Sequence, residues 1–95
     1  MMFKELDPLL HSQLRLAVVS LLMSFDSAEF TFIKEKTNST AGNLSVQLDK
    51  LAEAGYISIE KSFKGKKPLT TCRITKNGMK AFEEYVNNLK DYIRK

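Results

Sequence analysis

The polar residues between positions 39 and 50 are of the types that recognise base edges and phosphates. Four of them are spaced three, one and three residues apart, which makes one stripe on a helix without an acidic member. They are Asn43, Val46, Gln47 and Lys50. Amide side chains pair with adenine in the major groove, valine contacts a thymine methyl group, and lysine reaches guanine or phosphate. Ser39, Thr40 and Ser45, near the start of this helix, could donate to phosphate oxygens, which the helix dipole also favours. An ordinary solvent-facing helix is the alternative interpretation.

A basic stretch follows, and it contains no Asp or Glu from Lys61 to Phe82. Its seven cations are Lys61, Lys64, Lys66, Lys67, Arg73, Lys76 and Lys80. Positive charges without counter-charges repel one another, and an anionic partner such as a phosphate backbone removes that cost. An ordinary lysine-rich loop is the alternative here. Together with the polar stripe, this basic stretch indicates that the protein binds double-stranded DNA.

A helix-turn-helix is the arrangement expected to position the polar stripe. Asp7 and Pro8 predict the start of a first helix, which runs from Pro8 to about Ser24. Residues 29–32 predict a very short strand or extended lead-in, and Thr31 is placed to cap a short helix from Ile33 to about Thr37. A turn over residues 38–40 then leads into a second, amphipathic helix.

This amphipathic helix should run from about Thr40 to about Ala54 and end at Gly55. Its buried stripe consists of Leu44, Leu48, Leu51 and Ala52. A strand over residues 56–63 should place Ile57, Ile59 and Phe63 on one face. A loop over 64–68 and a second strand over 69–75 complete a hairpin, and Thr75 caps a last helix over about 76–95.

Length and composition predict one folded domain over residues 1–95. The chain is 43% apolar and 27% charged, with a formal net charge of +4, which is typical of a globular protein with a thin core. The longest apolar run is too short to cross a bilayer, so we expect no membrane association and a cytoplasmic location. One cysteine and one histidine predict no metal site and no disulfide, and we expect no cofactor. No set of nucleophile, acid and base is visible, so an enzyme is not expected.

Excess apolar helix surface predicts a homodimer. In the last helix, five residues are spaced three or four apart, as in a coiled-coil seam with Tyr85 beside it. The expected interface consists of Leu9, Leu16, Met79, Phe82, Val86, Leu89 and Ile93. The seam could instead pack on the first helix of its own subunit. A two-fold dimer implies a pseudo-palindromic operator with half-sites about one helical turn apart.

Cys72 and His11 are the residues of types that can act as redox or pH switches. Cys72 alternates with Ile74, which favours an inward and inert thiol over a redox sensor. His11 is expected to be an interface or surface residue and not a pH or metal switch.

Residues 40–57, from Thr-Ala-Gly-Asn-Leu-Ser to Ala-Gly-Tyr-Ile, resemble the recognition helix and first wing strand of MarR-like winged-helix regulators. The resemblance extends to residues 11–16, 61–68 and 71–78, and so covers nearly the whole chain. It implies an α+β, mostly α, winged helix-turn-helix fold with a three-helix core, a β-hairpin wing and a C-terminal dimerisation helix. The chain departs from full-length members in lacking their long additional terminal helices, so the resemblance does not extend to their effector pocket.

The resemblance also implies roles for individual residues. Asn43, Ser45, Val46 and Gln47 would enter the major groove, and Lys64, Lys66 and Lys67 would flank the minor groove or the backbone, with help from Arg73. The predicted function is therefore a sequence-specific transcription regulator. Two alternatives remain open, because a fold does not fix a function. One is a module for binding protein or RNA, and the other is a repressor with a small-molecule effector bound between the first and last helices, near Met23, Phe82 and Tyr85.

Overall fold

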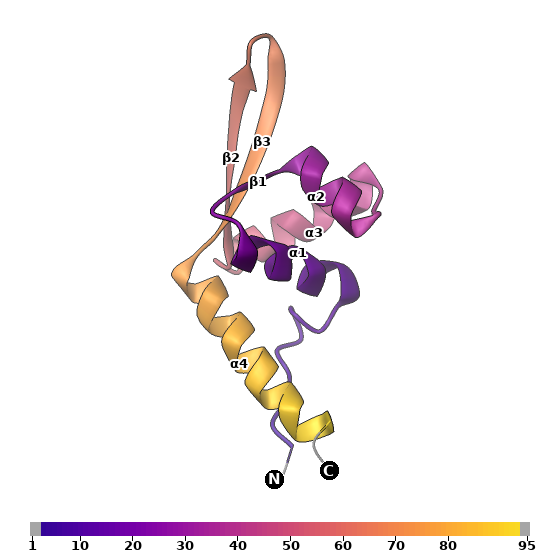
Figure 1. Ribbon diagram of the computed structural model, residues 1–95, viewed down its shortest axis with the longest axis vertical. Helices are drawn as coiled ribbons and strands as arrows, with labels where there is room; N and C mark the ends of the chain where they lie inside the picture. Colours follow the sequence, from indigo (N-terminus) through magenta and orange to yellow (C-terminus); the bar gives the residue numbers. More distant parts are fainter. Residues whose placement is uncertain (1–2, 94–95) are drawn as a thin grey trace.

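A computed structural model describes residues 3–93, arranged as four helices and a three-stranded antiparallel sheet. The elements are α1 (Gln13–Ser24), β1 (Ala28–Glu29), α2 (Phe30–Thr37), α3 (Ala41–Glu53), β2 (Ile57–Lys64), β3 (Lys67–Ile74) and α4 (Lys76–Ile93). Helices α1 to α3 form the centre of a molecule 54 Å long, the β2–β3 hairpin projects from one end, and α4 lies at the other with both termini (Figure 1). The mostly helical α+β fold with a three-helix core and a projecting hairpin is confirmed.

The core lies where α1, α2 and α3 meet the base of the hairpin. The residues with the most deeply buried side chains are Leu10, Val18, Val19, Leu22, Ile33, Leu44, Leu51 and Cys72. In α3 the three buried leucines, Leu44, Leu48 and Leu51, recur at helical spacing, as predicted. Their burial fixes which side of α3 faces solvent.

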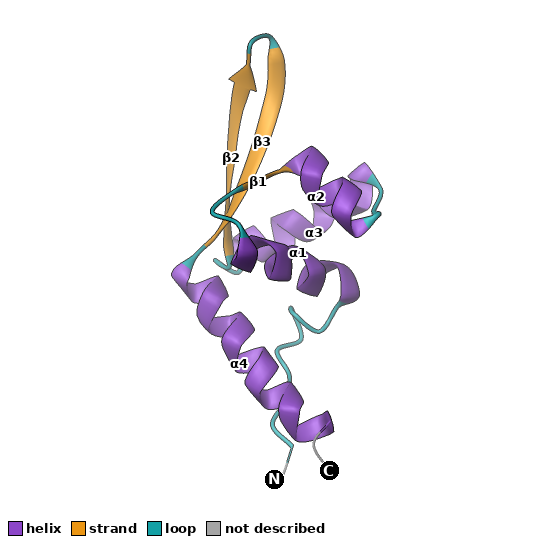
Figure 2. Ribbon diagram, in the orientation of Figure 1, coloured by secondary structure: helices purple, strands orange, loops and turns teal. Residues whose placement is uncertain are grey.

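The hairpin, which we call the wing (residues 57–74), is a regular antiparallel pair. Ile57 pairs with Ile74 at its base and Lys64 pairs with Lys67 at its tip, so the turn contains only Gly65 and Lys66. Gly65 has a φ of +66°, a conformation that favours glycine and suits a two-residue hairpin turn. The predicted loop over 64–68 is therefore too long, because Lys64, Lys67 and Pro68 belong to the strands (Figure 2).

The start of the first helix was predicted wrongly. Asp7 and Pro8 open a separate turn, in which the Leu9 amide donates to Asp7 Oδ1 at 2.9 Å and the His11 amide donates to the Asp7 carbonyl at 2.9 Å. Helix α1 begins only at Gln13, with Ser12 as its N-cap. The same Asp side chain that can cap a helix can close a turn, which is why the sequence signal was ambiguous.

The short second helix also begins earlier than predicted. Strand β1 contains only Ala28 and Glu29, which pair with Cys72 and Thr71 of β3. Helix α2 follows directly from Phe30, so Glu29 is the N-cap residue and Thr31 lies inside the helix. Pairing with β3 ends after two residues because the chain turns at once to cover the core with Ile33.

Helix α4 begins as predicted, and hydrogen bonds join its start to the turn between α3 and β2. The Gly78 amide donates to Thr75 Oγ1 at 3.0 Å, and Thr75 Oγ1 donates to the Gly55 carbonyl at 2.6 Å. Tyr85, expected beside the seam of α4, is buried, and its hydroxyl lies 2.9 Å from His11 Nδ1. Residues 94–95 of the predicted helix lie outside the described residues.

Candidate nucleic-acid interface

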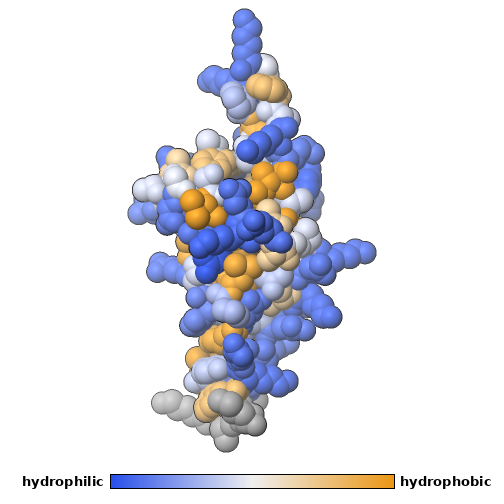
Figure 3. Space-filling view, turned by 180° about the vertical axis from the view of Figure 1, so that it is seen from behind, coloured by the Kyte–Doolittle hydropathy of each residue, from blue (hydrophilic) through white to orange (hydrophobic). Residues whose placement is uncertain are grey.

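Three of the four stripe residues of α3 are exposed on one side of the helix. Asn43, Val46 and Lys50 face solvent, and Val46 keeps 51% of its surface exposed. This side is opposite to the buried leucines, because both sets follow the helical repeat. The view from behind, which brings α3 forward, shows a largely hydrophilic surface with isolated hydrophobic patches (Figure 3).

Gln47 is placed differently from the other three. Its side chain is half-buried, and its Oε1 accepts a hydrogen bond from the Nη1 of Arg15 on α1. Its Nε2 donates to Asn43 Oδ1 at 3.0 Å. Gln47 therefore lies on the predicted polar side of α3, but α1 supplies a cation that holds its carbonyl oxygen.

The predicted hydroxyl residues at the start of α3 are partly engaged within the protein. Thr40 Oγ1 caps α3 by accepting from the Asn43 amide at 3.2 Å, and Ser39 Oγ lies 2.9 Å from Thr37 Oγ1. Ser45 is exposed and lines a hollow of about 270 Å³ between α3 and the wing. Lys61 lines the same hollow together with Asp49, so an acid of α3 lies near this lysine.

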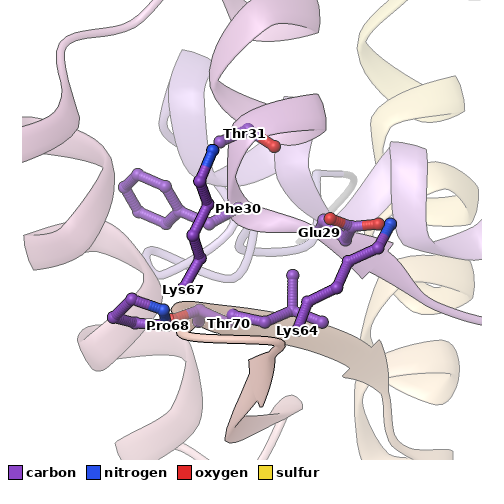
Figure 4. Close-up of a pocket in the computed structure, with 8 residues that line it drawn as sticks. Glu29, Phe30, Thr31, Lys64, Lys67, Pro68 and Thr70 are labelled. Atoms are coloured by element: carbon purple, nitrogen blue, oxygen red, sulfur yellow. The ribbon is translucent and has the colours of Figure 1, made fainter.

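The wing carries most of its cations at its tip. Lys64, Lys66 and Lys67 are all exposed. Lys64 and Lys67 extend toward the start of α2, over a hollow of about 280 Å³, with Lys64 directed toward Glu29 and Lys67 toward Thr31 (Figure 4). Glu29 belongs to β1, so folding brings an acid near the stretch that contains none in its own sequence.

Phe63 is an exposed aromatic residue within this cationic tip. It is paired across the wing with Pro68 and keeps 73% of its surface exposed. Phe63 was predicted to share a face with Ile57 and Ile59, and the regular strand keeps this alternation. The ring is nevertheless exposed, because the wing extends past the core at this point. The sequence signal for an exposed ring was its position next to Lys64, in a strand whose alternation continues past the core.

Arg73 lies apart from the tip, at the base of the wing opposite Ser58. Its guanidinium donates to the Asp26 carbonyl at 3.5 Å. The structure therefore separates Arg73 from the lysines of the tip and places it beside the loop that joins α1 to β1.

Two side chains near the interface have perturbed pKa values. The hydrogen bond to Asp7, followed by burial, raises the pKa of Tyr56 to about 12. Burial raises the pKa of the Cys72 thiol to about 11, which agrees with the predicted inert thiol. Neither group carries charge near neutral pH, so the charge of this surface comes from its lysines and arginines.

Arg15 is the residue that sequence reasoning missed. It donates to the Leu9 carbonyl at 2.6 Å through Nε and to Gln47 through Nη1, so it joins the segment before α1 to α3. The available signal was that Arg15 is the one charged residue of α1. A cation in an otherwise apolar helix usually has a partner.

Within residues 3–93 no group of three or more His, Cys, Asp or Glu side chains is arranged to hold a metal ion. No helix in this range is long and apolar enough to cross a membrane. The cytoplasmic location remains a prediction.

Known proteins share this arrangement of helices and strands. A model of the winged helix DNA-binding domain family matches residues 14–93, from α1 to the end of α4. The chain belongs to this family. Its membership confirms the prediction of a DNA-binding regulator of the winged-helix class.

This winged-helix domain is similar to several individual proteins. An uncharacterized protein of Methanocaldococcus jannaschii is 37% identical over 76 residues, which is 80% of this chain and 83% of that protein. A transcriptional regulator homologue from Pyrococcus horikoshii has a TM-score of 0.82 at 27% identity, over 90% of this chain and 84% of its own.

The likeness to MarR-family proteins is one of fold. A MarR-family transcriptional regulator from Silicibacter pomeroyi has the same fold, with a TM-score of 0.69 at 15% identity, over 90% of this chain and 57% of its own. The winged-helix domain thus has the architecture predicted for it.

Proposed function

We propose that this winged-helix domain regulates transcription by binding duplex DNA sequence-specifically, with α3 in the major groove and the wing on the backbone. The observation that carries the proposal is the exposed side of α3, where Asn43, Val46 and Lys50 project together without an acid among them. An α-helix with its side chains is about 10–12 Å across and the major groove is about 12 Å wide, so the helix fits.

The chemistry of this side suits base edges. Asn43 offers an amide, Val46 offers methyl groups that fit a thymine methyl, and Lys50 offers a cation for guanine or phosphate. Ser45 and Lys61, which line the hollow between α3 and the wing, are placed to meet the phosphates bordering the groove.

The wing supplies a second contact, independent of sequence. Lys64, Lys66 and Lys67 at its tip neutralise phosphates and release counterions, which makes binding dependent on salt. Arg73, at the base of the wing and bonded to Asp26, would contact a phosphate only farther along the duplex.

A salt titration with a matched lysine pair tests the proposal. The full chain is titrated with a random-sequence duplex at increasing salt, together with Lys66→Ala and Lys90→Ala. Lys66→Ala should weaken binding to all duplexes and reduce the salt slope by about 1. Lys90→Ala removes the same charge from α4 and should have no effect. An affinity that does not change with salt concentration, or an equal loss of affinity in both variants, contradicts the proposal.

Sequence specificity needs a separate test. Sites selected from random duplexes should bind the wild-type chain more tightly than random DNA does. Asn43→Ala should lower this discrimination by about 1–3 kcal/mol, whereas Lys66→Ala should leave it unchanged. A structured RNA competitor that displaces the selected duplex at equal concentration would favour the RNA-binding alternative.

A homodimer joined through α1 and α4 would present two copies of α3 to a pseudo-palindromic operator. Apolar side chains remain exposed on these helices, with Ile93 at 70% and Met23 and Met79 at 39% each. The other proposed interface residues, Leu9, Leu16, Phe82, Val86 and Leu89, are half-buried within one chain, so each could extend its contacts across the interface.

A small-molecule effector remains a prediction. The hollow between α1 and α4 is about 190 Å³ and is lined by Met23, Phe82 and Val86, whereas Tyr85 is buried and does not line it. Pockets for drug-sized ligands are usually above about 300 Å³. An effector at this place would therefore be very small or would sit between two copies of the chain.

A further inference from the structure

The strongest feature not used above is the chain of hydrogen bonds that runs from α1 to the exposed side of α3. Arg15 Nη1 donates to Gln47 Oε1, and Gln47 Nε2 donates to Asn43 Oδ1 at 3.0 Å. A second bond, from Arg15 Nε to the Leu9 carbonyl at 2.6 Å, fixes the guanidinium in place.

This chain has only one possible direction. A guanidinium has donors and no acceptor, so the group facing it must be the carbonyl oxygen of Gln47. The amide nitrogen of Gln47 must then face Asn43, and a nitrogen that donates requires the carbonyl oxygen of Asn43 opposite it. Both amide orientations are therefore set by one side chain on another helix that can only donate.

The consequence appears at Asn43, where this series of hydrogen bonds ends. Asn43 is exposed, its Oδ1 is engaged by Gln47, and within residues 3–93 no hydrogen bond engages its Nδ2. Asn43 thus turns a donor group outward. Without the chain, its amide could rotate and offer either a donor or an acceptor.

We infer that Arg15 is a specificity-determining positioning residue, which makes Asn43 a reader of acceptor atoms on the base it contacts. The inference rests on the proposed function, in which α3 enters the major groove. Guanine presents two acceptors there, N7 and O6, whereas cytosine presents an N4 donor. Adenine presents one acceptor, N7, beside its N6 donor, so an outward donor favours it less than guanine. Guanine should therefore be preferred at this position and cytosine disfavoured.

The test reverses the hydrogen bond between residues 47 and 43. In Gln47→Glu the new carboxylate still accepts from Arg15 but cannot donate to Asn43. Asn43 must then donate to it through Nδ2 and turn Oδ1 outward. This variant keeps the Arg15 contact and the side-chain size, so it should fold, and thermal unfolding checks this.

Base preferences are read by selecting bound sites from random duplexes with each purified chain. Asn43→Ala identifies the position that Asn43 reads, because preference is lost only there. At that position the wild type should favour guanine over cytosine by roughly fivefold or more, and Gln47→Glu should move the preference to cytosine or adenine. The added negative charge weakens binding to every duplex, and a carboxylate can itself accept from cytosine N4. Gln47→Glu is therefore compared with the double variant Gln47→Glu/Asn43→Ala, in which a shift caused by Asn43 must disappear.

Two substitutions of Arg15 form the matched control. Arg15→Lys keeps a group that only donates and should retain the guanine preference. Arg15→Gln keeps hydrogen bonding but can donate or accept. It should reduce the logarithm of the guanine-to-cytosine ratio by about half or more.

The outcomes separate the two claims. A wild-type chain that selects no site overturns the proposed function. A wild-type chain that selects a site but prefers cytosine at the Asn43 position, or a Gln47→Glu variant that keeps the guanine preference, overturns the role of Arg15 and leaves the proposed function standing.

Discussion

The hydroxyl of Tyr56 donates a hydrogen bond to Asp7 Oδ2, which joins the residue after the α3–β2 turn to the segment before α1. The other oxygen of Asp7 accepts from the Leu9 amide. One carboxylate therefore holds the turn that precedes α1 and attaches that turn to the base of the wing.

This bond predicts a loss of stability at high pH. The pKa of Tyr56 is raised to about 12, above its ordinary value of 10.0, so the folded chain keeps the proton that the unfolded chain releases. The contribution is complete below pH 10 and is lost as the pH rises toward 12. Urea unfolding at pH 8, 10, 11 and 12 should show that the stability advantage of the wild type over Tyr56→Phe, about 1 kcal/mol at pH 8, shrinks over this range. A constant advantage across the series would contradict this assignment.

Gly78 predicts a steric requirement at the start of α4. A Cβ added there would lie 2.1 Å from the Tyr56 carbonyl oxygen, which accepts from the Thr75 amide at 3.0 Å. Gly78→Ala should destabilise the fold by about 1–3 kcal/mol or more, because backbone must move. Gly42 has nothing within 4 Å of such a Cβ, so Gly42→Ala is the control and should be neutral or stabilising by up to about 1 kcal/mol. Thermal unfolding measures both, and equal effects would refute the close packing.

Cys72 should be unreactive in the folded chain. It is fully buried, and burial raises its pKa to about 11, so almost no thiolate forms at pH 8. A thiol reagent such as DTNB at pH 8 should label the chain only after denaturant is added. Stoichiometric labelling of the native protein within minutes would show that this part of the core opens.

Phe63 should contribute to DNA binding and not to folding. Its ring is exposed and surrounded by the cationic tip, so Phe63→Ala should leave the unfolding temperature within about 1 °C because little buried surface is lost. Phe63→Ala should nevertheless weaken duplex binding. When the neighbouring lysines bind phosphates, the apolar ring would contact sugar or base surfaces in a groove. Fluorescence anisotropy gives the affinity, with Tyr92→Ala on α4 as a control for loss of an exposed aromatic ring. Unchanged affinity would remove Phe63 from the interface.

The proposed dimer predicts a response to charge on α4. Val86 lines the hollow beside Met23, and a carboxylate there would be buried by a second copy. Sedimentation velocity should show twice the mass of one chain for the wild type and a single chain for Val86→Glu. Lys80→Glu, on another side of α4, should remain dimeric. A monomeric wild type at tens of micromolar would contradict the proposed dimer.

Much of the architecture could be predicted because the apolar residues follow regular periods. The leucines of α3, Gly55 at its end, and the alternation of Ile57 and Ile59 each place an element by local physics. Asp7 misled the prediction, because a capping side chain also closes turns. The alternation that includes Phe63 contains no information about where the core ends.

The interface was less predictable, because its decisive contacts join distant parts of the chain. Arg15 and Gln47 are separated by 32 positions, and Glu29 reaches the wing only through the pairing of β1 with β3. Helical spacing placed Gln47 on the polar side of α3 correctly, but it contains no information about the cation that α1 brings beside it.

The most direct test of the account is an NMR titration of the ¹⁵N-labelled full chain with a selected duplex. If α3 enters the major groove and the wing grips the backbone, the largest amide shift changes will fall on Asn43, Val46 and Lys50 and on Lys64 to Lys67, and α4 will change little beyond general broadening. Changes concentrated on α4, with α3 and the wing unaffected, would contradict the central claim.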